Sequence, residues 1–391
     1  MSNREAVIVG VADAPLEKGR VKGGGTVLSI QARAAKEALE SAGLGLKDVD
    51  GLLVSGIWGL PGPGMLPSIT VGEYLGIQPR YTECTNIGGS VFELLVARAK
   101  DAIEAGQCEV AVVLYGSTQK SDGFKFNVPR PPYFNMQYES SYGMPAPMGG
   151  YAMGAMRHMH EFGTTSAQLA EIAVAARKWA QLNPAATMRD PLTVDDVLAS
   201  PMISDPLHLL DACLVTDGGG CIVLTTAERA KDLTKPPIHV LGHGESHTHW
   251  HIAQMPDLAL LSAAQAAGRD AFAMAGLTPA DIDIAQLYDS FTITVLLTLE
   301  ALGFCERGEG GDFVSGGRIA PGGDFPLNTS GGGLSNAHPG MLGLYLLVEA
   351  CRQLWGEGGD RQVAGVKTAL CHGTGGTLSS GATCILSTER G

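Results

Sequence analysis

The chain has 391 residues, 45% of them hydrophobic, and a formal net charge of −13 from 27 basic and 40 acidic residues. This length suggests two domains around a large buried core, and the acidic balance argues against a nucleic-acid or anionic-membrane surface. No apolar run approaches the roughly 18 residues of a membrane span, and the N-terminal residues lack a signal-peptide pattern. We therefore expect a cytoplasmic protein that binds neither nucleic acid nor a membrane.

The first part of the chain alternates apolar strands with helices. An apolar strand (5–13) precedes an Ala-rich helix that Gly43 ends, and a second strand follows at 51–56. The amphipathic segment 89–106 predicts a further helix, and the apolar segment 108–117 predicts a buried strand. This order is typical of parallel α/β units.

An unusual segment, 120–208, interrupts this pattern and is rich in methionine and aromatic residues. Met is pliable and suits an irregular apolar pocket. One interpretation is a substrate pocket for a bulky apolar group, lined by Tyr142, Met148 and Met153. The other is a loosely packed surface excursion with a Met-rich core.

A repeat organises the whole chain. Residues 34–50, AAKEALESAGLGLKDVD, recur as residues 267–283, AGRDAFAMAGLTPADID, with seven identical positions at a constant offset of 233 residues. Each copy follows an apolar strand and precedes another one. Ala-rich helices that end in Ala-Gly-Leu are common in α/β proteins, but the matched flanking strands favour a duplication.

The second part of the chain continues as the first does. A helix is predicted at 341–359 and a strand at 366–376, and each half closes with an apolar strand, 218–226 in one and 381–388 in the other. The sequence therefore predicts an α/β fold of two similar halves, 1–240 and 241–391, with the segment 120–208 inserted into the first half.

This duplicated α/β pattern, a Gly-rich loop before a helix near residue 90, and the loops LSNAHPG (334–340) and CHGTGG (371–376) resemble the thiolase superfamily over essentially the whole chain. The similarity is greater to its sterol-carrier-protein-type branch. That branch includes benzoylsuccinyl-CoA thiolase and aldolases that shorten steroid side chains. The resemblance implies a five-layer αβαβα thiolase fold, although a fold alone does not give the reaction.

Three loops carry the catalytic residues that the resemblance implies. His338 corresponds to the histidine that binds the thioester oxygen or activates the thiol. In CHGTGG we expect His372 to act as the acid/base, with Cys371 one position away and with Gly375 and Gly376 in the loop. Tyr288, in YDSF (288–291), stands where relatives hold a catalytic water, and its phenol can donate to an oxyanion or protonate an enolate.

The first loop departs from the thiolase pattern. TECTNIGGSVF (82–92) has no cysteine at the nucleophile position, and the loop residues there are Gly88, Gly89 and Ser90. Cys84 is the nearest thiol, and it can serve as nucleophile only if the loop is rearranged. A cysteine buried in a strand is the alternative interpretation.

Two reactions remain open at this stage, and the resemblance favours thiolysis because it is the commoner chemistry of the superfamily. Thiolysis of a bulky β-ketoacyl-CoA needs a covalent acyl-enzyme and hence a thiolate. Retro-aldol cleavage of a β-hydroxyacyl-CoA needs a base and a stabilised enolate but no nucleophile. An inactive thiolase-like scaffold that binds acyl-CoA is a third interpretation.

The resemblance also implies partners. It predicts coenzyme A as a substrate, with no bound cofactor, and a homodimer that pairs the first halves. It further predicts a small subunit of the zinc-ribbon/OB-fold (DUF35) type. The scattered cysteines form no Cys-x-x-Cys pair, and the histidine-rich segments 157–163 and 247–251 lack a clear set of further ligands, so we expect no metal site in this chain.

Overall fold

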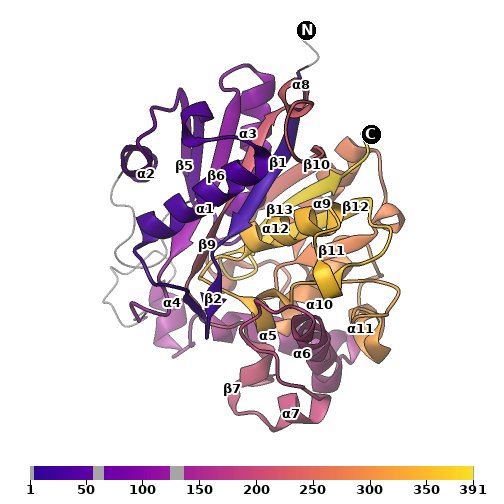
Figure 1. The fold of residues 1–391 in the computed structure, drawn as a ribbon. Helices are drawn as coiled ribbons and strands as arrows, with labels where there is room; N and C mark the ends of the chain where they lie inside the picture. Colours follow the sequence, from indigo (N-terminus) through magenta and orange to yellow (C-terminus); the bar gives the residue numbers. More distant parts are fainter. Residues whose placement is uncertain (1–3, 56–65, 124–135, 391) are drawn as a thin grey trace.

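The computed structural model describes residues 4–55, 66–123 and 136–390, and its centre is a mixed sheet of nine strands (Figure 1). The strand order is β11-β12-β13-β10-β1-β9-β6-β4-β5. The pairs β4–β5, β4–β6 and β11–β12 are parallel, and the other pairs are antiparallel. The strands are β1 (Ala6–Asp13), β4 (Gly51–Ser55), β5 (Tyr81–Thr85), β6 (Val110–Ser117), β9 (Gly218–Thr226), β10 (Ile238–His247), β11 (Ile284–Leu287), β12 (Thr368–Gly375) and β13 (Ser380–Ser387). The predicted α/β class is confirmed.

Four long helices divide the fold into layers. They are α1 (Val27–Ala42), α3 (Val91–Glu104), α9 (Ser262–Ala275) and α12 (Gly343–Leu354). Helix α1 packs on β1, β6 and β9, whereas α9 packs on β10 and β13. Helix α3 touches both β4 and β12, which are six strands apart in the sheet order, about 29 Å in a flat sheet. The sheet therefore curls around α3 and α12, and the chain has the five-layer arrangement that the sequence predicts.

The two halves of the sheet meet at β1 and β10, through the residue pairs Val7–His239 and Ile8–Ile238. The predicted boundary at residue 240 falls inside β10. Both faces of β1 are buried because helices cover the sheet on each side, which explains why its sequence is a continuous apolar run rather than an alternating one.

The duplication is visible in matching close contacts. A Cβ atom on Gly10 of β1 would overlap the carbonyl oxygen of Ala38 in α1, and a Cβ atom on Gly242 of β10 would overlap that of Ala271 in α9. Strand pairing shifts its register at both glycines. Since Ala38 and Ala271 are 233 residues apart, the two halves use the same device to bring a helix against a strand.

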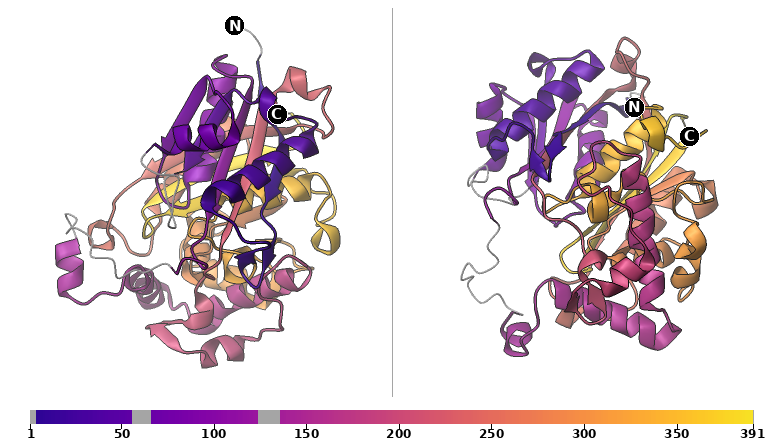
Figure 2. Two further views of the ribbon diagram at one scale, coloured as in Figure 1. Left: turned by 60° about the vertical axis from the view of Figure 1, so that its left-hand side comes forward. Right: turned by 60° about the horizontal axis from the view of Figure 1, so that its bottom comes forward.

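The inserted segment covers the second half of the chain. Its helices α5 and α6 pack against α10, and α6 also packs against α11. In Figures 1 and 2 this segment lies at the end of the molecule opposite the two termini. The elements of the insert and its neighbours are α4 (Met136–Ser141), α5 (Met148–Phe162), α6 (Ser166–Gln181), α7 (Val194–Ala199), β7 (Met202–Ser204), β8 (Leu207–His208), α10 (Thr292–Ala301) and α11 (Gly310–Val314).

The remaining elements are small: β2 (Leu16–Glu17), β3 (Arg20–Val21), α2 (Pro67–Leu75) and α8 (Ala227–Ala230). Within the described ranges, each helix is too short or too polar to traverse a lipid bilayer.

Candidate functional site

A tyrosine and a histidine from two loops form a buried pair. Tyr288 directly follows β11, and its backbone N–H donates to the carbonyl of His372, extending the pairing with β12. The Tyr288 hydroxyl lies 2.8 Å from His338 Nε2, and the two rings meet edge to face at 87°. The structure therefore brings together two of the residues that the sequence singles out.

The loop that carries His338 is held by buried hydrogen bonds. Asp289 accepts the backbone N–H groups of Gly333 (2.7 Å) and Leu334 (3.1 Å), inside the π-helical turn Gly332–Asn336. The backbone N–H of His338 donates to Thr216 Oγ1 at 3.1 Å. These bonds from two other segments fix the histidine without using its ring.

Burial sets the protonation of the pair. Desolvation lowers the pKa of His338 to about 4, so its imidazole is neutral at physiological pH. Desolvation also raises the pKa of Tyr288 well above its usual value, so its phenol keeps its proton. In the tautomer that carries its proton on Nδ1, His338 Nε2 accepts the hydrogen bond from the phenol, and the neutral imidazole is able to take up a proton.

The Gly88–Ser90 loop lies against this pair. A Cβ atom on Gly89 would come within 2.6 Å of the Tyr288 hydroxyl oxygen and would overlap its ring. A Cβ atom on Gly88 would come within 2.6 Å of the backbone nitrogen of Gly376 and within 2.7 Å of Gly375 Cα. The Ser90 hydroxyl is buried, 2.9 Å from the hydroxyl of Ser380. Two glycine-rich loops, one from each half, thus meet beside Tyr288.

Cys84 lies apart from the N-terminus of α3. It is part of β5, where it pairs in register with Val54, and its thiol is free and exposed, so the alternative of a cysteine buried in the strand is wrong. Partial burial, and then Glu83, raise the pKa of this thiol, which disfavours the thiolate. The position before α3 is occupied by Ser90. The structure therefore shows no rearranged loop that carries a thiol to the helix.

His372 and Cys371 point to opposite faces of β12, as neighbouring strand residues do. Cys371 belongs to the core cluster that holds Tyr288, and its Sγ lies 3.6 Å from the carbonyl of Leu346 in α12. His372 lies on the same face of β12 as Leu370, which belongs to the core cluster under α9 and α10. Its Nδ1 shares a 2.8 Å hydrogen bond with Thr383. The structure therefore does not bring the His372 ring to the Tyr288–His338 pair.

A tyrosine of the insert reaches the Gly375–Gly376 loop. Tyr151 of α5 packs its ring on Phe291, with centroids 4.5 Å apart, and donates its hydroxyl to the carbonyl of Gly376 at 3.1 Å. Of the three residues expected to line a substrate pocket, Met148 is half-buried against the core, whereas Met153 and Tyr142 are exposed. The sequence offered no motif that separates Tyr151 from the other aromatics of the insert.

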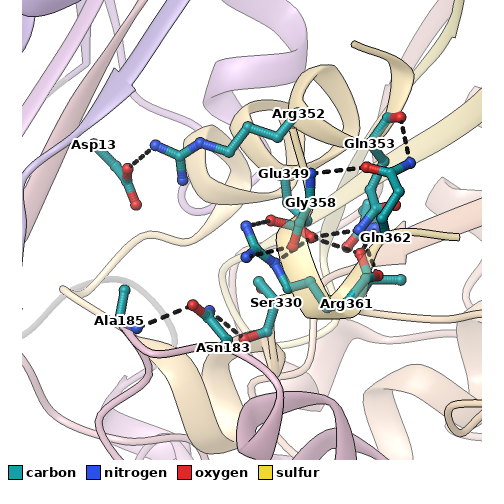
Figure 3. Close-up of polar contacts among 12 residues, drawn as sticks. Asp13, Asn183, Ala185, Ser330, Glu349, Arg352, Gln353, Gly358, Arg361 and Gln362 are labelled. Carbon is teal, nitrogen blue, oxygen red and sulfur yellow. Dashed lines mark hydrogen bonds and ion pairs between the residues drawn. The ribbon is translucent and has the colours of Figure 1, made fainter. Parts of the chain in front are cut away.

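A cavity of about 300 Å³ adjoins the His338 loop, where Asn336 and Ala337 form part of its wall. Figure 3 shows its charged groups: Arg352 pairs with Asp13, and Arg361 makes two hydrogen bonds to Glu349, each 2.9 Å long. Since these charges already neutralise one another, the network serves to anchor α12.

The histidine-rich segment 247–251 is engaged in ordinary hydrogen bonds. His249 Nε2 lies 3.0 Å from the carbonyl of Thr377, and His251 Nδ1 lies 3.1 Å from Glu139 of α4. In the part of the chain that the structure describes, no cluster of three or more histidine, cysteine or acidic side chains is arranged to hold a metal ion.

Comparisons with known proteins identify the family of the chain. A family model described as "Thiolase C-terminal domain-like" matches residues 244–388. The 17-hydroxy-3-oxo-4-pregnene-20-carboxyl-CoA lyase of Mycobacterium tuberculosis is 34% identical over 97% of this chain and 99% of that protein. A steroid side-chain-cleaving aldolase of Thermomonospora curvata is 32% identical, over 95% of each chain. The solved structure of the Ltp2-ChsH2(DUF35) aldolase superposes with a TM-score of 0.87 at 32% identity, covering 99% of this chain and 98% of that one.

The chain therefore belongs to the thiolase superfamily. Within it, the chain is similar over nearly its full length to an acyl-CoA lyase and to steroid side-chain aldolases.

Proposed function

We propose that this enzyme cleaves a carbon–carbon bond of a β-hydroxyacyl-CoA by a retro-aldol reaction. The products are a carbonyl compound and a shorter acyl-CoA. The observation that carries the proposal is the 2.8 Å hydrogen bond between Tyr288 and neutral His338. It is supported by the two aldolase and lyase relatives that align over nearly the whole chain.

The pair can move the proton that this reaction requires. The β-hydroxyl of the substrate gives its proton to the Tyr288 oxygen while Tyr288 passes its own proton to His338 Nε2. The bond between the α- and β-carbons then breaks, the β-carbon becomes a carbonyl, and the electron pair passes to the thioester as an enolate. The same proton returns through Tyr288 to the α-carbon, so the reaction consumes no other group.

Thiolysis of a β-ketoacyl-CoA is the second candidate. It is favoured by the chemistry of the superfamily and by Cys84, a free thiol at the end of the strand that leads to α3. It requires a thiolate that attacks the β-carbonyl. The raised pKa of Cys84 and its position in β5 make the retro-aldol route the better fit.

The acyl group of the substrate is proposed to be bulky and apolar. The lyase and the aldolase that align over nearly the full chain are named for steroid-derived substrates. In this chain, Tyr151 and Phe291 form an aromatic contact beside the two glycine-rich loops. Coenzyme A is accordingly part of the substrate and the product.

We further propose two kinds of partner. The Ltp2-ChsH2(DUF35) aldolase supports a small DUF35-type subunit for this chain as well. A homodimer through the first halves is supported by β5, an edge strand of the sheet whose residues are alternately half-buried and exposed. Such an edge offers unpaired backbone groups to a second strand.

The test uses the chain co-expressed with a DUF35-type protein. The probes are a β-hydroxyacyl-CoA whose β-carbon belongs to a cycloalkyl ring, and a β-ketoacyl-CoA of similar size with free CoA. We expect the first probe to yield a cyclic ketone and a shorter acyl-CoA, with no covalent mass on the intact protein and no loss of rate in Cys84→Ser. An acyl group on Cys84, with cleavage of the second probe alone, would establish thiolysis instead.

A further inference from the structure

A buried glutamate next to the site has no partner. Glu93 lies in the first turn of α3 and is 1% exposed. Neither oxygen of its carboxyl group has a hydrogen-bond partner among the described residues, and none of the ion pairs found there includes it. Fully buried glutamates are rare unless they are paired, so the burial of Glu93 without a partner requires an explanation.

Two glycines of the second half make room for this carboxyl group. A Cβ atom on Gly343, the first residue of α12, would come within 2.9 Å of Glu93 Oε1 and would overlap Oε2. A Cβ atom on Gly373 of β12 would come within 2.8 Å of Glu93 Cδ. Any side chain at either position would expel the carboxyl group.

The Glu93 carboxyl also borders the loop that supports Tyr288. The carbonyl oxygen of Gly89 lies against Gly343 on the side that faces Glu93, and it accepts the Gly343 N–H at 3.2 Å. Gly89 in turn lies directly beneath the Tyr288 ring. A single residue therefore separates Glu93 from the phenol of the proton-transfer pair.

The charge state of Glu93 decides how it acts on that residue. The titratable groups that interact with it are the thiols of Cys371 in β12 and Cys384 in β13, whose pKa values burial raises. No cation among them compensates a carboxylate, and burial raises the pKa of Glu93 to about 8. A neutral acid can offer a hydroxyl to the Gly89 carbonyl, whereas a carboxylate repels it.

We propose that Glu93 is a positioning residue: its neutral carboxyl group holds Gly89 beneath Tyr288, and its ionisation displaces Gly89 and disturbs the Tyr288–His338 pair. The effect on turnover rests on the proposed function. The effect on the pair does not, because it can be measured without substrate.

The experiment compares the parent complex with Glu93→Gln, which keeps a neutral side chain of the same shape at every pH. The matched control is Glu104→Gln, the same change at the other end of α3. The parent kcat should fall about tenfold for each pH unit above about 8, with little change in KM. Glu93→Gln should keep its kcat at high pH, and Glu104→Gln should follow the parent.

A second measurement needs no turnover. In protein labelled with ¹⁵N-histidine, the His338 Nε2 signal, assigned with His338→Gln, should shift between pH 7 and pH 9 in the parent and stay in place in Glu93→Gln. An unchanged alkaline loss in Glu93→Gln would overturn the proposal, as would a His338 signal that ignores pH in the parent. If no acyl-CoA is cleaved but the signal behaves as expected, the proposed function fails and the role of Glu93 stands. Should Glu93→Gln not fold, the signal of the parent alone decides.

Discussion

The His338 loop and the His372 strand contain two histidines that look alike by burial and differ in what surrounds them. Both rings are buried, and desolvation lowers both pKa values, to about 4 for His338 and about 3 for His372. His338 follows an irregular turn that Asp289 anchors, and it meets the phenol of Tyr288. His372 is locked in a regular strand and meets Thr383. The difference shows that burial alone does not make a neutral imidazole catalytic. The loop that carries His338 must also place the ring against a proton donor.

The largest effect is expected at the loop histidine. His338→Ala removes the acceptor of the Tyr288 proton, so kcat for the β-hydroxyacyl-CoA should fall about 10²–10⁴-fold. Steady-state kinetics of the complex with its small subunit measure this loss. Equal losses of kcat in His338→Ala and His372→Asn would contradict the different roles assigned to the two histidines.

A smaller loss is expected from the residue that lets Tyr288 approach His338. Gly89→Ala places a methyl group where the Tyr288 ring lies. A displacement of the phenol by about 1 Å should reduce kcat about 10²-fold. The change leaves His372 untouched, so acid unfolding of Gly89→Ala should keep the parent slope while its kcat falls. Retention of full activity would show that Tyr288 does not need this position.

The smallest effect on rate is expected at the strand histidine, where stability should respond instead. In the unfolded chain each of these histidines has a pKa near 6.5. In the folded chain the pKa falls to about 4 for His338 and to about 3 for His372, so both imidazoles take up a proton only at lower pH. Folding stability is therefore lost as the pH falls below 6.5. His372→Asn should cost about 1–3 kcal/mol at neutral pH and should make this acid loss shallower.

Denaturant unfolding between pH 7 and pH 3.5 measures that slope, and the parent complex provides the reference. An unchanged slope in His372→Asn would mean that His372 binds its proton over the same pH range in the folded and the unfolded chain.

Much of the fold could be predicted because its signals are local. The helix that Gly43 ends and the helix that Gly276 ends are readable as copies, and both glycines adopt positive φ values of 80° and 67°. The motifs that contain Tyr288 and His338 could be recognised through the resemblance to the thiolase superfamily.

The sequence was a poorer guide to which face of β12 points toward the site. A shift of one residue in a strand exchanges the two faces: the resemblance led us to expect His372 at the site, whereas Cys371 shares the core cluster of Tyr288. The contacts of Tyr151 and Glu93 join segments that are far apart in the chain, so they depend on how whole elements pack.

The central helices have a consequence for how the protein can be divided. Each of α3 and α12 packs on strands from both halves, and Glu93 of one half fills a space between two glycines of the other. A half expressed alone would leave one face of its helix exposed to water, and neither half would form a closed core. The duplicated chain therefore behaves as one cooperative unit, and fragments cut near residue 240 would recover structure by complementing each other rather than by folding separately.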